Sequence, residues 1–241
     1  MKTAKKVRGA HAPFLRNRSI MKGWGNGMQV CCINAWNAGG LEKCKIEERA
    51  DLVVFGGVEQ AVDYQRELQG ETCFFREATM LSKRLQGVVV CGCTTVTHGL
   101  KRKSAMVAED GKLLGVSDRV HVLDLRENGG ATFRVYDTKI GKMGVAVAED
   151  LLFPEVIKTL ALCGSEFIVC TFGKLEKVHT VLARSHAYCF GVPILLCGKG
   201  HCLLANEKGE IAFSSPLTRA AFPLQPKPHY RMLQTRRRGD F

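Results

Sequence analysis

The sequence lacks the features that mark a membrane-spanning or exported chain. No apolar run comes near the length needed to cross a bilayer. The N-terminus is basic, but it has no uninterrupted apolar stretch followed by a small-residue cleavage site. These absences predict a cytoplasmic protein.

Signatures of metal and nucleotide sites are missing as well. Cys91 and Cys93 form a C-x-C pair rather than the C-x-x-C of zinc and redox sites. His179 and His186 lie two helical turns apart, too far for one ion without other ligands. The chain has no phosphate-binding G-x-x-x-x-G-K loop. We therefore expect neither a metal ion nor another cofactor.

What the sequence does have is the composition of one globular domain. Its 241 residues are 46% apolar and 24% charged, which suits a chain that buries a sizeable core. Four of its 11 cysteines stand in apolar, strand-like runs: Cys91, Cys93, Cys170 and Cys197. Because free cysteine is often buried and the chain has no export signal, we interpret these four as core residues rather than as a disulfide framework.

The net charge of +12 is concentrated at the two ends of the chain. No acidic residue occurs from Lys2 to Lys22, and a second basic run covers residues 236–238. Residues 1–27 show no periodicity and are predicted to be a flexible leader before a domain of residues 28–241. The basic ends are either solvated tails or a surface for nucleic acid or an acidic partner. The first interpretation is favoured, because no nucleic-acid-binding module accompanies them.

Strand-like and helix-like segments alternate from Met28 onward. Continuous apolar runs predict buried strands at residues 51–55, 88–91, 143–147, 167–171 and 194–197. Apolar residues spaced by three and four predict helices at residues 71–85, 154–163 and 175–190. In the last helix, the residues predicted to lie on one side are Leu175, Val178, Leu182 and Cys189. This order of elements implies a layered α/β domain with two covered sheets.

Three stretches resemble motifs of the carbon-nitrogen hydrolase (nitrilase) superfamily. Residues 50–55 (ADLVVF) resemble its second strand, and residues 110–122 (DGKLLGVSDRVHV) resemble its hairpin and lysine strand. Residues 141–161 (GKMGVAVAEDLLFPEVIKTLA) resemble its nucleophile elbow and the following helix. With weaker similarity at residues 200–211 and from Tyr230, the resemblance covers residues 28–241. It implies a single-domain, four-layer αββα sandwich of the nitrilase type.

Members of this superfamily cleave non-peptide amides or nitriles with a glutamate, a lysine and a cysteine. The thiol attacks the carbonyl or nitrile carbon, the carboxylate moves its proton, and the ammonium stabilises the anionic intermediate. Followed residue by residue, the motifs assign the glutamate position to Gly57, the lysine position to Arg119 and the cysteine position to Ala148. The resemblance therefore predicts that none of the three catalytic groups is intact.

Three nearby residues are candidates to replace the missing groups. Glu59 lies two residues past the glutamate position, Glu149 follows Ala148, and Cys170 ends the next predicted strand. The alternatives are a solvated loop glutamate for Glu59 and an inert core thiol for Cys170. A buried Glu149 needs a counter-charge, for which Arg119 is the predicted partner.

We expect Arg119, Glu149, Asp150 and Phe153 to line the pocket, which would take a small polar ligand. The pocket wall between His121 and Asp137 is shorter than is usual in the superfamily and contains no proline. The leading hypothesis is a catalytically inactive homologue, a pseudoenzyme that acts by ligand binding or assembly.

Two other functions stay open from the sequence. One is a residual or rerouted amidase or nitrilase that uses Glu59, Arg119 and Cys170. The other is a protein that binds nucleic acid or an acidic partner through its basic termini.

The resemblance also implies a homodimer or larger oligomer. Members of the superfamily associate across the face that bears the helix after the nucleophile and the late helix. In this chain, four residues of these two helices would divide between the core and the interface: Val156, Leu160, Val178 and Leu182.

Overall fold

The computed structural model describes residues 27–34, 41, 46, 49–56, 60–124 and 127–226. The first strands in this part of the chain are β1 (Met28–Ile33), β2 (Leu52–Phe55), β3 (Ala61–Asp63), β4 (Val88–Thr97), β5 (Leu100–Glu109) and β6 (Lys112–Asp118). The later strands are β7 (Arg134–Thr138), β8 (Gly141–Val147), β9 (Phe167–Lys174), β10 (Ile194–Lys199), β11 (His201–Ala205), β12 (Ile211–Ser215) and β13 (Arg219–Leu224). The helices are α1 (Tyr64–Leu68), α2 (Phe74–Leu85), the 3-10 helix η3 (Ala148–Leu152), α3 (Pro154–Leu162) and α4 (Lys177–Phe190).

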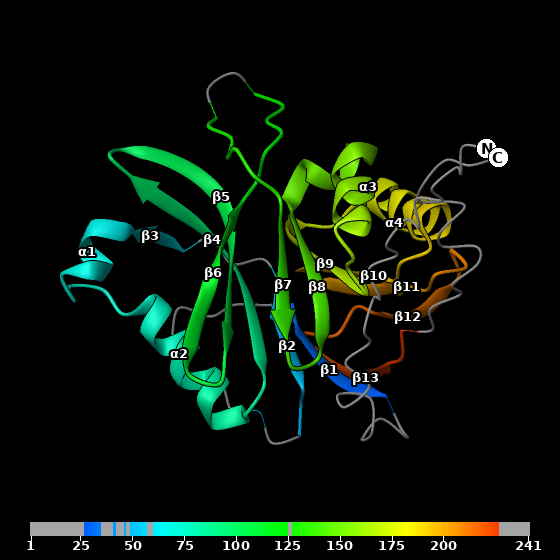
Figure 1. Ribbon diagram of the computed structural model, residues 1–241, viewed down its shortest axis with the longest axis horizontal. Coiled ribbons are helices and arrows are strands. Elements are labelled where there is room, and N and C mark those ends of the chain that lie inside the picture. Colours follow the sequence, from blue (N-terminus) through cyan, green and yellow to red (C-terminus); the bar gives the residue numbers. More distant parts are fainter. Residues whose placement is uncertain are drawn as a thin grey trace, which may run out of the picture.

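The strands form two sheets that lie face to face (Figure 1). The first has the order β13-β1-β2-β4-β5-β6, with β3 paired to the outer part of β4. The second has the order β12-β11-β10-β9-β8-β7. Each sheet has three parallel strands at its centre, β1-β2-β4 in the first and β8-β9-β10 in the second. Antiparallel strands complete both sheets toward their edges.

The four layers follow from three separate hydrophobic clusters. The largest lies between the two sheets and contains Val54, Val90, Val145 and Val169. A second cluster packs α2 against the first sheet, and a third packs α3 and α4 against the second sheet. Because alternate residues of each central strand face opposite clusters, the central strands are buried on both faces. The αββα sandwich predicted from the sequence is therefore confirmed.

Local sequence signals set the ends of the helices as predicted. Pro154 occupies the first turn of α3, where its fixed φ suits a helix and its missing N–H leaves no bond unmade. Gly191 ends α4 with a φ of 58°, a left-handed conformation that glycine adopts without steric cost. The predicted hairpin around Asp110 and Gly111 is also present, between β5 and β6.

The residues predicted to share one side of α4 differ in burial. The buried residues of this helix are Ala183, His186 and Ala187, whereas Val178 is 47% exposed and Cys189 is exposed. Small residues allow α4 to pack closely on η3 and on the second sheet. Leu182 is partly buried and packs against the cluster beneath the helix. Leu175 precedes the first turn of the helix.

Three short elements were missed by sequence reasoning: β3, α1 and β13. In β13, only three residues lie between Arg219 and Pro223, and the proline disfavours a strand. It is tolerated because β13 forms the edge of its sheet, where it pairs only with β1.

The four cysteines predicted to be core residues, Cys91, Cys93, Cys170 and Cys197, are all buried free thiols. Among the described residues, no helix is long and apolar enough to span a membrane. The predicted leader and the second basic run lie outside the described residues, apart from Gly27.

Candidate functional site

The turn after β8 brings Ala148 to the end of the second sheet, where the chain enters η3. Ala148 is buried and has a φ of 50°, in the left-handed region of backbone space. For a residue with a side chain this conformation costs roughly 1–2 kcal/mol, so the surrounding contacts must hold it. The sharp strand-to-helix turn expected of a nucleophile elbow is thus formed, and it carries a methyl group.

Arg119 follows β6 and is almost completely buried, with 1% of its side chain exposed. Its Nη1 donates to Oε2 of Glu149 at 2.5 Å, and its Nη2 donates to Oε2 of Glu127 at 2.7 Å. The ion pair between Arg119 and Glu149 that the sequence predicted is therefore present. Glu127 was not predicted, because it lies in an irregular loop where no periodic pattern assigns a direction to side chains.

A second cation, Lys103 of β5, joins the same two carboxylates. Its Nζ lies 2.9 Å from Oε1 of Glu149 and 3.8 Å from Oε1 of Glu127. We call Lys103, Arg119, Glu127 and Glu149 the ion-pair cluster. It contains two positive and two negative charges, so the guanidinium at the position predicted for the family's lysine is neutralised by the protein itself.

The hydrogen bonds within the cluster shift the pKa values of Glu149 and Arg119. Burial alone would raise the pKa of Glu149, but hydrogen bonds from Arg119 and Lys103 outweigh it and lower this pKa to about 2. Burial lowers the pKa of Arg119, whereas its hydrogen bonds with Glu149 and Glu127 raise it, and the net shift is upward. A carboxylate with so low a pKa is a poor proton acceptor near neutral pH.

Asp150 joins the elbow to the end of β6. Its buried carboxylate accepts hydrogen bonds from the backbone N–H groups of Val120 and His121, at 2.9–3.1 Å. It also lies 3.3 Å from Nδ1 of His121. Burial raises the pKa of Asp150, although these hydrogen bonds oppose the shift. The contacts of Asp150 are therefore those of a clamp between two strand ends.

Phe153 extends the same clamp. Its ring stacks on the imidazole of His121 with centroids 4.1 Å apart, and Phe133 lies beyond the imidazole at 6.2 Å. Nε2 of His121 is also 3.6 Å from Glu155. The predicted pocket residues Asp150 and Phe153 are thus brought to the elbow, where they contact neighbouring protein groups.

Cys170 does not share the surroundings of Ala148. Alternate residues of β9 face opposite ways, and Cys170 belongs to the cluster beneath α3 and α4, whereas Ala148 belongs to the cluster between the sheets. The thiol is fully buried, and burial raises its pKa far above the ordinary value. Gly57 and Glu59 lie outside the described residues.

The two sheets approach very closely at Gly56, where β2 ends. A Cβ placed on Gly56 would lie 2.4 Å from the carbonyl carbon and oxygen of Cys197. No real side chain tolerates such a contact with backbone atoms, so only glycine fits here.

Two polar atoms near the elbow are buried without a hydrogen-bond partner in the described part of the chain: Nε of Arg119 and Oγ1 of Thr171. Thr171 lies on β9 opposite Val147, the residue before Ala148. Buried polar atoms are seldom left unpaired, because each loses its bonds to water. Each atom is thus left with an unused hydrogen-bonding position, an N–H in Arg119 and a hydroxyl in Thr171.

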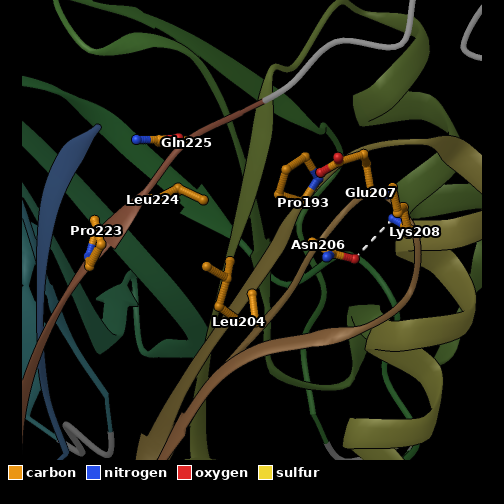
Figure 2. Close-up of a pocket in the computed structure, with 9 residues that line it drawn as sticks. Pro193, Leu204, Asn206, Glu207, Lys208, Pro223, Leu224 and Gln225 are labelled. Carbon is orange, nitrogen blue, oxygen red and sulfur yellow. Dashed lines mark hydrogen bonds between the residues drawn. The ribbon is translucent and has the colours of Figure 1, made fainter. Parts of the chain in front are cut away.

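A separate open groove of about 560 Å³ lies at the edge of the two sheets (Figure 2). Pro193, Leu204 and Leu224 form its apolar part, and the turn from Asn206 to Lys208 borders it. It contains none of the predicted site residues. Among the described residues, no group of three or more histidine, cysteine or acidic side chains is arranged to hold a metal ion.

The sequence profile of the carbon-nitrogen hydrolase family matches residues 45–219, which is most of the chain. The chain belongs to the carbon-nitrogen hydrolase family. This match includes the end of β6, the elbow at Ala148 and α3, so the described part of the candidate site lies within the matched region.

The relatives that this family member matches are aligned over only part of their length. A citrullinase of Francisella tularensis is 37% identical over 73 residues, which cover 27% of this chain and 26% of the relative. An omega-amidase of Saccharomyces cerevisiae, NIT3, is 28% identical over 142 residues, 48% of this chain and 49% of the relative. The alignments thus span about a quarter to a half of these relatives.

Solved structures agree with the fold over a longer region. The yeast Nit3 structure, described as a member of branch 10 of the nitrilase superfamily, has a TM-score of 0.67 at 17% identity and covers 88% of this chain and 94% of its own. A carbon-nitrogen hydrolase of Helicobacter pylori G27 has a TM-score of 0.63 at 19% identity, covering 78% and 85%. At such identities the likeness concerns the fold.

Replacing Glu149 by glutamine should change how stability depends on pH. The folded-state pKa of Glu149 is below its ordinary value of 4.5, so its contribution is complete above pH 4.5 and is lost as the pH falls toward about 2. Allowing for partial exposure and for the remaining Glu127, Glu149→Gln should lower the free energy of unfolding at pH 7 by about 2 kcal/mol. Urea denaturation between pH 7 and pH 2 measures both effects.

The matched control is Glu71→Gln, which removes an exposed ion pair with Arg66. It should cost no more than about 1 kcal/mol. Equal losses for the two variants, or an unchanged acid slope in Glu149→Gln, would contradict the role assigned to the ion-pair cluster.

Proposed function

We propose that this member of the family is a catalytically inactive homologue that binds a small polar ligand at the elbow. The observation that carries the proposal is Ala148, a methyl group at the tip of a correctly formed turn. A methyl group has no lone pair with which to attack carbon. In one well-studied hydrolase, loss of the nucleophile lowers kcat by about 10⁶.

The surroundings of Ala148 support the absence of a substitute nucleophile. Cys170 faces the helical layer and has a raised pKa, so its reactive thiolate form is scarce. The predicted partner of an anionic intermediate, Arg119, already binds two carboxylates. A positive charge that is neutralised in this way stabilises a developing oxyanion less strongly.

The nature of the ligand follows from the two unpaired polar atoms. Nε of Arg119 can only donate a hydrogen bond, and the hydroxyl of Thr171 can donate one. Two donors suit a carbonyl or carboxylate oxygen. Because the ion-pair cluster is neutral overall, a neutral amide or carbamoyl compound is favoured over a strongly charged anion. The names of the relatives, a citrullinase and an omega-amidase, are consistent with ligands of this kind.

The first test is ammonia release by the purified protein over a panel of small amides, carbamoyl compounds and nitriles. The wild type should show no steady turnover above buffer, because the methyl group of Ala148 cannot act as a nucleophile. Cys170→Ala and Glu59→Gln are measured beside it. Steady turnover that either substitution abolishes would overturn the proposal and would establish a rerouted amidase.

Binding is tested by thermal unfolding with the same panel. A ligand present at a hundredfold excess over its Kd should stabilise the wild type by about 2.7 kcal/mol. Thr171→Val, which removes the unpaired hydroxyl, should weaken this effect, whereas the exposed control Thr132→Val should retain it. Equal stabilisation of both variants would contradict the placement of the ligand at Thr171.

We also propose that the chain forms a homodimer through the outer surface of α3 and α4. The four residues predicted to divide between core and interface do differ in burial: Val156 and Leu160 are fully buried, Leu182 is half-buried, and Val178 is exposed. Val178, Val181 and Tyr188 follow one stripe of α4 and are 47–63% exposed. Leu162 lies on α3, the helix that packs against α4, and is 52% exposed. Such a patch is typical of an interaction surface.

Introducing a charge into this patch should dissociate the dimer. Sedimentation equilibrium is expected to give a dimer for the wild type and a monomer for Val181→Glu, because burying an unpaired carboxylate is strongly unfavourable. Leu68→Glu, at an 86% exposed position on α1, is the control and should remain dimeric. A monomeric wild type at micromolar concentration would exclude this interface.

A further inference from the structure

Three buried thiols lie together between the two sheets. Cys32 comes from β1 of the first sheet, and Cys197 and Cys202 come from β10 and β11 of the second. All three are free cysteines in the same hydrophobic cluster. We call them the thiol cluster. None of them has a role in the function proposed above.

The register of the β10–β11 hairpin decides which two thiols can form a bond. Gly198 lies opposite His201, and Cys197 lies opposite Cys202. The loop between Gly198 and His201 has only two residues. Gly198 and His201 themselves therefore exchange the first hydrogen bonds of the hairpin. Hydrogen-bonded and non-hydrogen-bonded pairs alternate, so the pair Cys197–Cys202 is non-hydrogen-bonded.

A non-hydrogen-bonded pair has the geometry that a disulfide needs. Its Cα atoms are about 4.5 Å apart and its side chains stand on the same face. Disulfides join residues whose Cα atoms are about 4.4–6.8 Å apart. Cys197 and Cys202 therefore need no backbone movement to be joined. Cys32 belongs to the opposite sheet, and no hydrogen-bonded ladder fixes its distance from either of them.

The polar surroundings distinguish the two sulfurs. A hydrogen bond from Cys32 lowers the pKa of Cys202 and outweighs the effect of burial, and a hydrogen bond with Asn34 adds to it. Sγ of Cys197 lies 3.3 Å from Oδ1 of Asn34 and 3.5 Å from the carbonyl oxygen of Val54, both acceptors for its S–H group. Cys202 is thus a thiol whose ionised form is stabilised by its neighbours.

We propose that Cys197 and Cys202 form a reversible cross-strand disulfide when the protein meets hydrogen peroxide. The thiolate of Cys202 attacks one peroxide oxygen, which keeps its hydrogen, and the O–O bond breaks. The other oxygen leaves as hydroxide and takes up the proton that Cys202 released, forming water. The resulting sulfenic acid is attacked by the sulfur of Cys197, whose proton leaves with the hydroxyl group as a second water. Two thiols lose two electrons in total, and one peroxide accepts them.

The position of this pair points to regulation rather than to added stability. A disulfide stabilises a fold mainly by closing a long loop, and only residues 198–201 lie between these two cysteines. The carbonyl group of Cys197 is also the backbone group that leaves no room for a side chain at Gly56. Oxidation therefore acts next to the end of β2, which leads into the predicted glutamate position.

The test is peptide mapping of the full chain after treatment with hydrogen peroxide and alkylation of the remaining thiols. Trypsin cleaves after Lys199, so Cys197 and Cys202 fall in the separate peptides 185–199 and 200–208. The first peptide also contains the exposed Cys189, so the experiment uses the variant Cys189→Ser. The exposed Cys163 serves as the internal reference for oxidation.

The expected product is a linked peptide pair that contains Cys197 and Cys202, separates on reduction and is absent from Cys202→Ser. Oxidation of Cys163 without any link between these two peptides would overturn the proposal. A link from Cys32 to either residue would also overturn it, because the bond would then have formed between the sheets.

Discussion

The buried guanidinium of Arg119 is the interaction on which the candidate site depends. A cation that is only 1% exposed is strongly unfavourable unless carboxylates lie within hydrogen-bonding distance. Glu149 and Glu127 supply them, and Lys103 balances the second negative charge. Because Glu149 follows Ala148 directly, the ion-pair cluster also holds the elbow. The ends of β5, β6 and β8 are thereby joined by charge as well as by packing.

This arrangement accounts for the kind of function proposed. A catalytic site keeps its charged groups available for the transition state, whereas here the charges satisfy one another. The clamp formed by Asp150, His121 and Phe153 makes the same region rigid. Among the described residues around the elbow, one N–H of Arg119 and one hydroxyl of Thr171 have no hydrogen-bond partner. In the proposed function they orient a small ligand, and Ala148 provides no nucleophile to attack it.

Much of the fold could be predicted because its signals are local. Continuous apolar runs marked the central strands, and Pro154 and Gly191 marked helix ends. The Arg119–Glu149 pair was predictable because both residues stand at fixed places in recognised motifs. Lys103 and Glu127 were not, since their approach to Arg119 depends on how a strand and an irregular loop are positioned in space. Which residues of α4 are buried was not predictable for a similar reason, because the packing of neighbouring layers favours small residues over the most apolar ones.

The most direct test of this account is a double-mutant cycle on Arg119 and Glu149, measured by urea denaturation at pH 7. Arg119→Met, Glu149→Gln and the double variant are compared with the wild type. If the two side chains stabilise each other as the geometry implies, the coupling free energy should be about 2 kcal/mol. Effects that add to within about 0.5 kcal/mol would show independent residues and would contradict the central place given to their ion pair.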